Sequence, residues 1–308
     1  MEPLTFLPIY MTRVWGGRSL ESIYHRDLPD DQPYGESWEI SDREDEQSVV
    51  KGGPYHGKTL HELWSSHREE IFGAGLHGDR FPLLIKILDA RDDLSIQVHP
   101  PTSIAKQLGG EPKTEMWFIA DCEPDAALYI GLKNGATRES FEQALREVTV
   151  EEVVHAVHPS PGESIFIPSG RLHAIGSGFL IYEIQQNSDT TYRVYDWNRV
   201  GLDGHPRDLH IDESLASIDF EDHEPTMDEP KGSTLASCEF FVVDRHELTD
   251  GQAIGNQEER FSILTVVSGT ITSSGGAEFQ KGDFLLLPKD ADPLRATGDT
   301  VVLQTRLP

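Results

Sequence analysis

Short runs of apolar residues, bounded by glycine, proline or aspartate, recur along the whole chain and predict a mostly β protein. Representative runs are PLLIKILDA (82–90), LSIQVH (94–99), MWFIADC (116–122), ESIFIP (163–168), FLIYEIQQ (179–186), FSILTVVSGTIT (261–272), DFLLLP (283–288) and TVVLQTRL (300–307). Helical spacing of apolar residues is confined to two segments, 59–73 and 137–157. Many short strands with few helices are typical of jelly rolls and β-barrels.

A repeated pattern of glycine and proline occurs in both halves of the chain. GESIFIPSGRLH (162–173) reads as Gly, five residues, Pro, one residue, Gly, two residues and His. GDFLLLPKDADP (282–293) begins in the same way, but Pro293 stands where the first copy has His173. Because both copies lie in β-rich surroundings, we interpret them as parts of two related β modules.

The limits of these modules follow from the composition between them. An acidic, proline-containing stretch at 219–232 has the character of a linker. We therefore predict an N-terminal module at 1–220, with a small helical insertion at about 137–157. A degenerate C-terminal module without metal ligands is predicted at 233–308.

Charge and cysteine content limit the kinds of binding partner and the cellular compartment that we expect. The 308 residues include 53 acidic and 26 basic side chains, and the formal net charge is −27. Such a field repels nucleic acids and anionic membrane surfaces, so we expect neither as a partner. Cys122 and Cys238 are far apart, and the first residues lack the pattern of a signal peptide. We therefore expect a protein of the reducing cytoplasm.

Four residues form a candidate metal-binding set. Gln97 and His99 are two apart in a predicted strand, so both side chains lie on one face. Glu115 begins the next strong strand, and His173 ends the first copy of the repeat. Two imidazoles, a carboxylate and an amide suit zinc and, less selectively, other first-row divalent ions. A strand histidine with a purely structural hydrogen bond is the alternative for His99.

Longer strings in the first two thirds of the chain resemble type I mannose-6-phosphate isomerases (phosphomannose isomerases) of the cupin superfamily. The strings are GESWEIS (35–41), FPLLIKILDARDDLSIQVHP (81–100), KTEMWFI (113–119), IPSGRLHAIGSG (167–178) and EIQQNSDTTYRVYDWNR (183–199). The chain is similar to the short bacterial form, which lacks the large helical domain of longer members. The resemblance implies two cupin-type β-barrel or jelly-roll modules, with the site in the first.

The resemblance also implies the reaction and the residues that carry it. The family interconverts mannose 6-phosphate and fructose 6-phosphate through a cis-enediol intermediate, with one Zn²⁺ per chain. Its catalytic arginine corresponds to Arg193, and a lysine beside the metal corresponds to Lys113. Its zinc ligands correspond to Gln97, His99, Glu115 and His173.

Several roles stay open at the level of sequence. Arg193 suits substrate binding or charge stabilisation, because guanidinium stays protonated and binds oxygens bidentately. Its alternative is an ion pair with Asp189 or Asp196. Lys113 is a candidate for phosphate contact or proton relay, with a surface lysine as the alternative. Ser103 is a candidate phosphate contact or a helix-capping residue.

The catalytic base and the class of function each have competing candidates. Zinc-bound water, Lys113 and Glu183 all remain candidates for the base. A cupin oxygenase using iron and O₂, and a non-catalytic sugar-phosphate sensor, are the alternative functions, because cupin folds host many activities. The favoured interpretation is a monomeric or weakly associated isomerase acting on a small sugar phosphate.

Overall fold

The computed structural model describes residues 1–308 and divides into two compact units. Unit 1 comprises Met1–Ile9, Trp38–Ile85 and Glu229–Pro308, and unit 2 comprises Tyr10–Ser37 and Lys86–Asp228. Neither unit is a continuous stretch of sequence. The module limits at 1–220 and 233–308, which rest on the composition of the stretch between them, stay a prediction.

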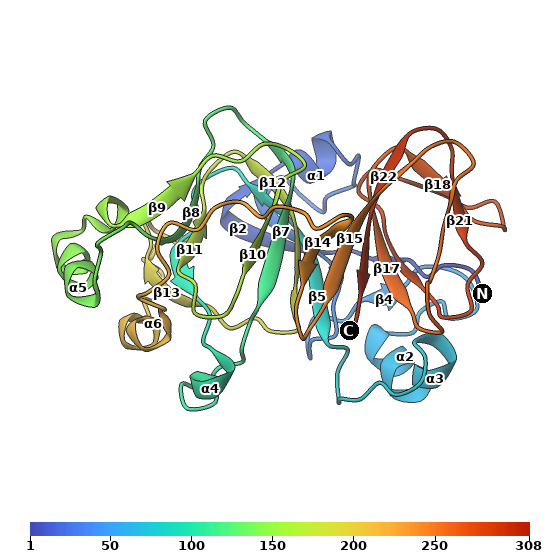
Figure 1. The fold of residues 1–308 in the computed structure, drawn as a ribbon, viewed down its shortest axis with the longest axis horizontal. Coiled ribbons are helices and arrows are strands. Elements are labelled where there is room, and N and C mark those ends of the chain that lie inside the picture. Colours follow the sequence, from blue (N-terminus) through green and yellow to red (C-terminus); the bar gives the residue numbers. More distant parts are fainter. The chain divides into compact units, whose positions relative to one another are not determined.

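Unit 2 is built on two antiparallel sheets (Figure 1). The larger sheet has the spatial order β10 (Ser164–Ile167), β7 (Glu115–Cys122), β12 (Phe179–Gln186), β5 (Leu83–Ala90), β2 (Ile9–Gly17) and β3 (Tyr34–Ile40). The second has the order β13 (Tyr192–Tyr195), β6 (Ile96–Val98), β11 (His173–Ile175), β8 (Leu128–Leu132) and β9 (Val154–Val157). The boundary between the units falls within β2, β3 and β5.

The apolar core of unit 2 lies between these sheets. Trp117 and Ile181 from the larger sheet join Ile130 and Ile175 from the second in one buried cluster. Alternation along each strand directs these side chains inward. The predicted mostly β cupin-like architecture is therefore confirmed for this unit.

The helices of unit 2 are short and lie outside the two sheets. They are α1 (Ser19–Ser22), α4 (Thr102–Ala105), α5 (Arg138–Glu147), the 3₁₀ turn η1 (Val150–Glu152) and α6 (Ile211–Ser217). No helix in either unit combines the length and apolar character needed to cross a membrane.

The predicted helix at 137–157 is correct in its first half and wrong in its second. A capping box between Thr137 and Ser140 begins α5, which buries Phe141. The helix ends at Glu147, where Val148 takes a left-handed conformation with φ of 60°. Residues 154–157 instead form β9, because the β-branched residues of this segment pair with β8.

Unit 1 also contains two larger sheets and a two-stranded one. Its five-stranded sheet has the order β14 (Thr234–Ser237), β15 (Val242–Leu248), β22 (Thr300–Arg306), β17 (Ser262–Ser268) and β20 (Phe284–Leu287). The four-stranded sheet has the order β16 (Ala253–Ile254), β21 (Leu294–Ala296), β18 (Thr270–Thr272) and β19 (Glu278–Gln280). β1 (Phe6–Leu7) pairs with β4 (Val49–Val50).

The predicted helix at 59–73 is confirmed, with a break at its centre. It forms α2 (Leu60–Ser66) and α3 (Arg68–Ile71), and a capping box from Thr59 begins it. Phe72 follows α3 and packs edge-on against Phe261, which directly precedes β17, with ring centroids 5.1 Å apart. This aromatic contact, with the backbone hydrogen bonds from Phe261 to Phe72 and from Lys289 to Ile71, joins this segment to the C-terminal residues.

Candidate active site

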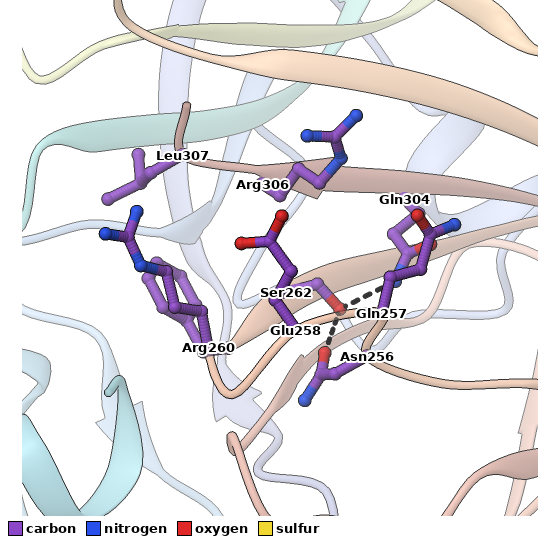
Figure 2. Close-up of a pocket in the computed structure, with 9 residues that line it drawn as sticks. Asn256, Gln257, Glu258, Arg260, Ser262, Gln304, Arg306 and Leu307 are labelled. Carbon is purple, nitrogen blue, oxygen red and sulfur yellow. Dashed lines mark hydrogen bonds between the residues drawn. The ribbon is translucent and has the colours of Figure 1, made fainter. Parts of the chain in front are cut away.

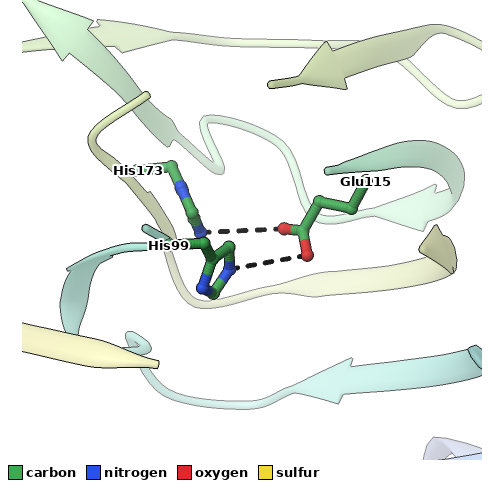
Figure 3. Close-up of side chains that lie close together, drawn as sticks. All are labelled: His99, Glu115 and His173. Atoms are coloured by element: carbon green, nitrogen blue, oxygen red, sulfur yellow. Dashed lines mark ion pairs between the residues drawn. The ribbon is translucent and has the colours of Figure 1, made fainter. Parts of the chain in front are cut away.

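Three buried side chains in unit 2 converge between the two sheets. His99, Glu115 and His173 are each at most 1% exposed, and their ligand-type atoms all lie within 4.8 Å of one another. His99 Nε2 lies 3.5 Å from Glu115 Oε2, and His173 Nε2 lies 3.6 Å from Glu115 Oε1 (Figure 3). Both imidazoles therefore face the same carboxylate.

Strand register brings the remaining candidates to this point. Gln97 on β6 lies opposite His173 on β11 and opposite Arg193 on β13. Directly opposed residues project from the same face of a sheet, so these three side chains form one row. Gln97 Nε2 lies 3.4 Å from His173 Nε2. Glu115 faces this row from the start of β7 in the other sheet.

Backbone carbonyls fix both histidines in one tautomer. His99 Nδ1 lies 2.9 Å from the carbonyl oxygen of Thr190, and His173 Nδ1 lies 2.8 Å from that of Arg171. Because a carbonyl only accepts, each Nδ1 must donate, which leaves the lone pair on Nε2. Burial lowers the pKa of His99 to about 3 and also lowers the pKa of His173, so both rings are neutral. This is the arrangement of metal-binding histidines.

Glu115 completes a donor set that fits a divalent metal ion. Burial by itself raises the pKa of Glu115, but Lys113, His99 and His173 together outweigh burial, so the pKa lies well below its usual range. Lys113 Nζ lies 2.7 Å from Glu115 Oε2 and 3.3 Å from His99 Nε2, so a cation already lies beside these atoms. Glu115 Oε1 is buried and accepts no hydrogen bond. The two imidazole Nε2 lone pairs and the carboxylate oxygen that accepts no hydrogen bond are suitable ligands for such an ion.

A chain of buried charges with alternating sign continues from this cluster across the larger sheet. Lys113 Nζ lies 3.8 Å from Glu183 Oε1, and Lys86 Nζ lies 3.4 Å from the same oxygen. Lys86 Nζ is also 3.7 Å from Glu36 Oε2, and Arg13 Nε is 3.0 Å from Glu36 Oε1. Because each charge lies next to an opposite one, the set lowers the electrostatic cost of its own burial.

These groups line a cleft of about 410 Å³, a size that suits a small-molecule ligand. Its wall includes Gln97 and Arg193, two of the three side chains in the row described above, together with the alternating charges. The lining residues are Arg13, Trp15, Glu36, Lys86, Leu88, Leu94, Ser95, Gln97, Lys113, Glu183, Asp189, Thr191, Arg193 and Arg207.

Arg193 faces the cleft without a carboxylate partner. Its Nε donates to Ser95 Oγ at 3.2 Å, and its Nη1 donates to the carbonyl oxygen of Asp208 at 2.9 Å. Asp196 pairs instead with Arg199, at 3.0 Å, and with Arg207. The ion-pair alternative for Arg193 is therefore wrong, and its guanidinium keeps donors for a ligand.

Ser103 lies apart from the residues of the cleft. It is exposed on α4 and is not among the lining residues. The capping residue of α4 is Pro101, and no side chain caps this helix. The structure supports neither the predicted phosphate contact nor the capping role.

Four charged residues of the cleft, one of them Arg207, were not singled out from the sequence. Arg13, Glu36 and Lys86 come from β2, β3 and β5. Lys86 gave the clearest signal, because it is a single charge within the apolar strand LLIKILDA and is only 4% exposed. A charge in such a strand needs a buried partner, here Glu183.

Comparisons with known proteins bear on both halves of the chain. Residues 5–130 match the family described as phosphomannose isomerase type I, catalytic domain, and residues 231–306 match the mannose-6-phosphate isomerase cupin domain. Mannose-6-phosphate isomerase ManA of Bacillus subtilis is 40% identical over 299 residues, which cover 93% of each chain. A mannose-6-phosphate isomerase of Streptococcus mutans is 34% identical, covering 98% of this chain and 97% of the relative.

Solved structures show the same fold throughout. The crystal structure of mannose 6-phosphate isomerase from Bacillus subtilis superimposes with a TM-score of 0.90 at 33% identity, and all of both chains is covered. A zinc-bound mannose 6-phosphate isomerase shares the fold with a TM-score of 0.78 at 17% identity, again over all of both chains. With curated relatives that match over nearly its whole length, this chain belongs to the type I phosphomannose isomerase family.

Proposed function

We propose that this chain interconverts mannose 6-phosphate and fructose 6-phosphate, with one Zn²⁺ per chain. The observation that carries the proposal is the pair of Nε2 lone pairs that face one ionised carboxylate beside a cleft with free cationic donors. Family membership supports the isomerase over an oxygenase or a sensor. We also propose a cytoplasmic location and a monomeric or weakly associated state.

His99, Glu115 and His173 would hold the zinc ion, with Gln97 as the fourth ligand. Rotation of the Gln97 amide exchanges its nitrogen and oxygen with little change of shape, so its oxygen can face the ion. When bound, zinc supplies Lewis-acid stabilisation of negative charge on the substrate oxygens, worth several kcal/mol.

Arg193 is placed to bind the negative charge of the substrate. It lies next to Gln97 in the strand register, and its unused donors face the cleft. A guanidinium binds phosphate or enediolate oxygens through two parallel hydrogen bonds. This local cation also counters the repulsion that the net charge of −27 exerts on an anionic substrate.

Glu183 is our candidate for the catalytic base. It lies in the cleft wall, Trp117 Nε1 donates to its Oε2 at 3.1 Å, and its Oε1 accepts no hydrogen bond. Burial, together with the charge of Glu115, raises the pKa of Glu183, which makes the carboxylate a better proton acceptor. It would take the proton from carbon 2 of mannose 6-phosphate and return it to carbon 1.

Lys113 is better suited to donating a proton than to accepting one. Burial alone lowers its pKa, but the carboxylates of Glu115 and Glu183 outweigh burial and raise it. The ammonium therefore persists at neutral pH. We assign it the transfer of the proton between the oxygens on carbons 1 and 2.

A coupled assay of fructose 6-phosphate formed from mannose 6-phosphate tests the proposal on the full chain. We expect turnover, no oxygen consumption, and the reverse reaction from fructose 6-phosphate. Tight binding of mannose 6-phosphate without product would favour the sensor. Oxygen uptake by the iron-loaded chain without isomerisation would favour the oxygenase.

A further inference from the structure

The strand register gives a residue-by-residue equivalence between the two copies of the repeat. In the first copy, Ile167 comes directly before Pro168, the proline of the repeat, and lies opposite Glu115 of β7. In the second copy, Leu287 has the same place before its proline and lies opposite Ser262 of β17. Ser262 is therefore the counterpart of the metal-ligand candidate Glu115.

The neighbouring strand extends this equivalence. On β12, Glu183 lies opposite Trp117, two residues after Glu115. On β22, Gln304 lies opposite Leu264, two residues after Ser262. Gln304 is thus the counterpart of Glu183.

The residues before these strands complete the comparison. Arg260 precedes Ser262 by two residues, as Lys113 precedes Glu115. Pro293 replaces the imidazole of His173. The second copy has lost two carboxylates and a histidine but has kept a cation, so it favours an anion over a metal ion.

A pocket lies at this position in unit 1, and its floor is polar (Figure 2). Ser262 and Gln304 are each 2% exposed. Gln304 Nε2 donates to Ser262 Oγ at 3.0 Å and to the carbonyl oxygen of Gly255 at 3.1 Å, and Ser262 Oγ donates to Asn256 Oδ1 at 2.7 Å. Both side-chain hydrogen bonds of Gln304 are made by Nε2, and no group of the chain donates to its Oε1. The void of about 30 Å³ has room for one hydroxyl group.

Two guanidinium groups form the wall above this floor. Arg260 Nη1 donates to the carbonyl oxygen of Pro308 at 3.0 Å, and Arg306 pairs with Asp244 at 3.2 Å. Figure 2 shows the carboxylate of Glu258 projecting between the two guanidinium groups. No ion pair joins Glu258 to either arginine, so their remaining donors are available.

We propose that this pocket of the C-terminal module binds the phosphate ester of a small polyol without a metal ion. The phosphate group lies between Arg260 and Arg306, where bidentate hydrogen bonds suit its oxygens, and it displaces the Glu258 carboxylate. A hydroxyl of the ligand donates to Gln304 Oε1. The second module thus keeps the ability to bind a ligand after losing the residues for zinc chemistry.

Calorimetric titration of the full chain with sn-glycerol 3-phosphate tests this site. Arg260→Gln should weaken binding about tenfold, because charge-assisted hydrogen bonds are lost. Glu258→Gln should tighten binding about threefold, because a competing carboxylate is removed. Arg295→Gln is the matched control, since Arg295 Nη1 also donates to a carbonyl oxygen, that of Gly251 at 3.0 Å, but lies outside the pocket.

The two substitutions must act in opposite directions. The ligand also binds in the cleft of unit 2, but the substitutions in unit 1 leave that background unchanged. Unchanged isomerase activity shows that each variant is folded. Equal dissociation constants for the unsubstituted chain, Arg260→Gln and Glu258→Gln would overturn the proposal.

Discussion

Corresponding strand positions in the two modules carry different chemistry. In the first module, Glu115 and Glu183 are buried carboxyl groups beside Lys113. In the second, the same positions hold Ser262 and Gln304. The fold supplies two similar sets of positions, and the side chains decide which set can hold a metal ion.

The two sets also differ in what holds them together. Lys86, Lys113, Glu115 and Glu183 are each at most 5% exposed and depend on one another for compensation. Ser262 and Gln304 are neutral and are joined by hydrogen bonds. Removing one buried charge leaves its partner uncompensated, whereas removing one neutral group does not. Substitutions at paired positions should therefore have unequal effects.

The largest inequality is expected between Glu115→Gln and Ser262→Ala. Glu115→Gln removes the charged ligand, and we expect loss of bound zinc and a fall in kcat/KM of at least about a thousandfold. Ser262→Ala should change neither. Zinc analysis and the coupled assay on both variants measure the difference. Retained zinc and activity in Glu115→Gln would remove Glu115 from the metal site.

The second comparison is between Lys113→Met and Arg260→Met in the zinc-free chain. Lys113→Met leaves Glu115 buried without its cation, so the free energy of unfolding should fall by about 3–5 kcal/mol. Arg260 is only partly buried, and its replacement should cost about 1 kcal/mol or less. Urea denaturation gives both values. Equal losses would show that the charge chain does not depend on Lys113.

A third substitution makes the first module resemble the second. Glu183→Gln introduces the amide that Gln304 provides in the other copy, and kcat should fall about a hundredfold because the proton acceptor is lost. Zinc content should stay at one ion per chain, which separates this variant from Glu115→Gln. Full activity in Glu183→Gln would transfer the role of base to another group.

The smallest effect is expected when the geometry of a cation changes but its charge does not. Arg193→Lys replaces a planar fork by a single ammonium, and kcat/KM should fall about tenfold. Arg138→Lys, on the exposed face of α5, is the control and should have no effect. Equal activity of the two variants would mean that Arg193 does not contact the substrate.

The core of the site could be predicted from the sequence because strand alternation is local. Gln97 and His99 lie two residues apart, and a period of two places them on one face. The repeat and the family resemblance supplied His173 and Glu115. The structure brings these residues together as expected.

The buried charge chain could not be predicted in the same way. Lys86 and Glu183 are far apart in the chain, and alternation within a strand does not give the register between distant strands. The helix predicted at 137–157 is too long for a similar reason. Residues 154–157 form a strand because they pair with β8. The packing of Phe72 on Phe261 is likewise a contact between distant segments.

The most direct test of the central claim is the activity of the chain after metal is stripped by a chelator and zinc is restored. The account predicts that stripping abolishes conversion of mannose 6-phosphate to fructose 6-phosphate. One zinc ion per chain should then restore it. Full activity in the stripped chain, or a folded chain with one zinc ion and no activity, would contradict the account.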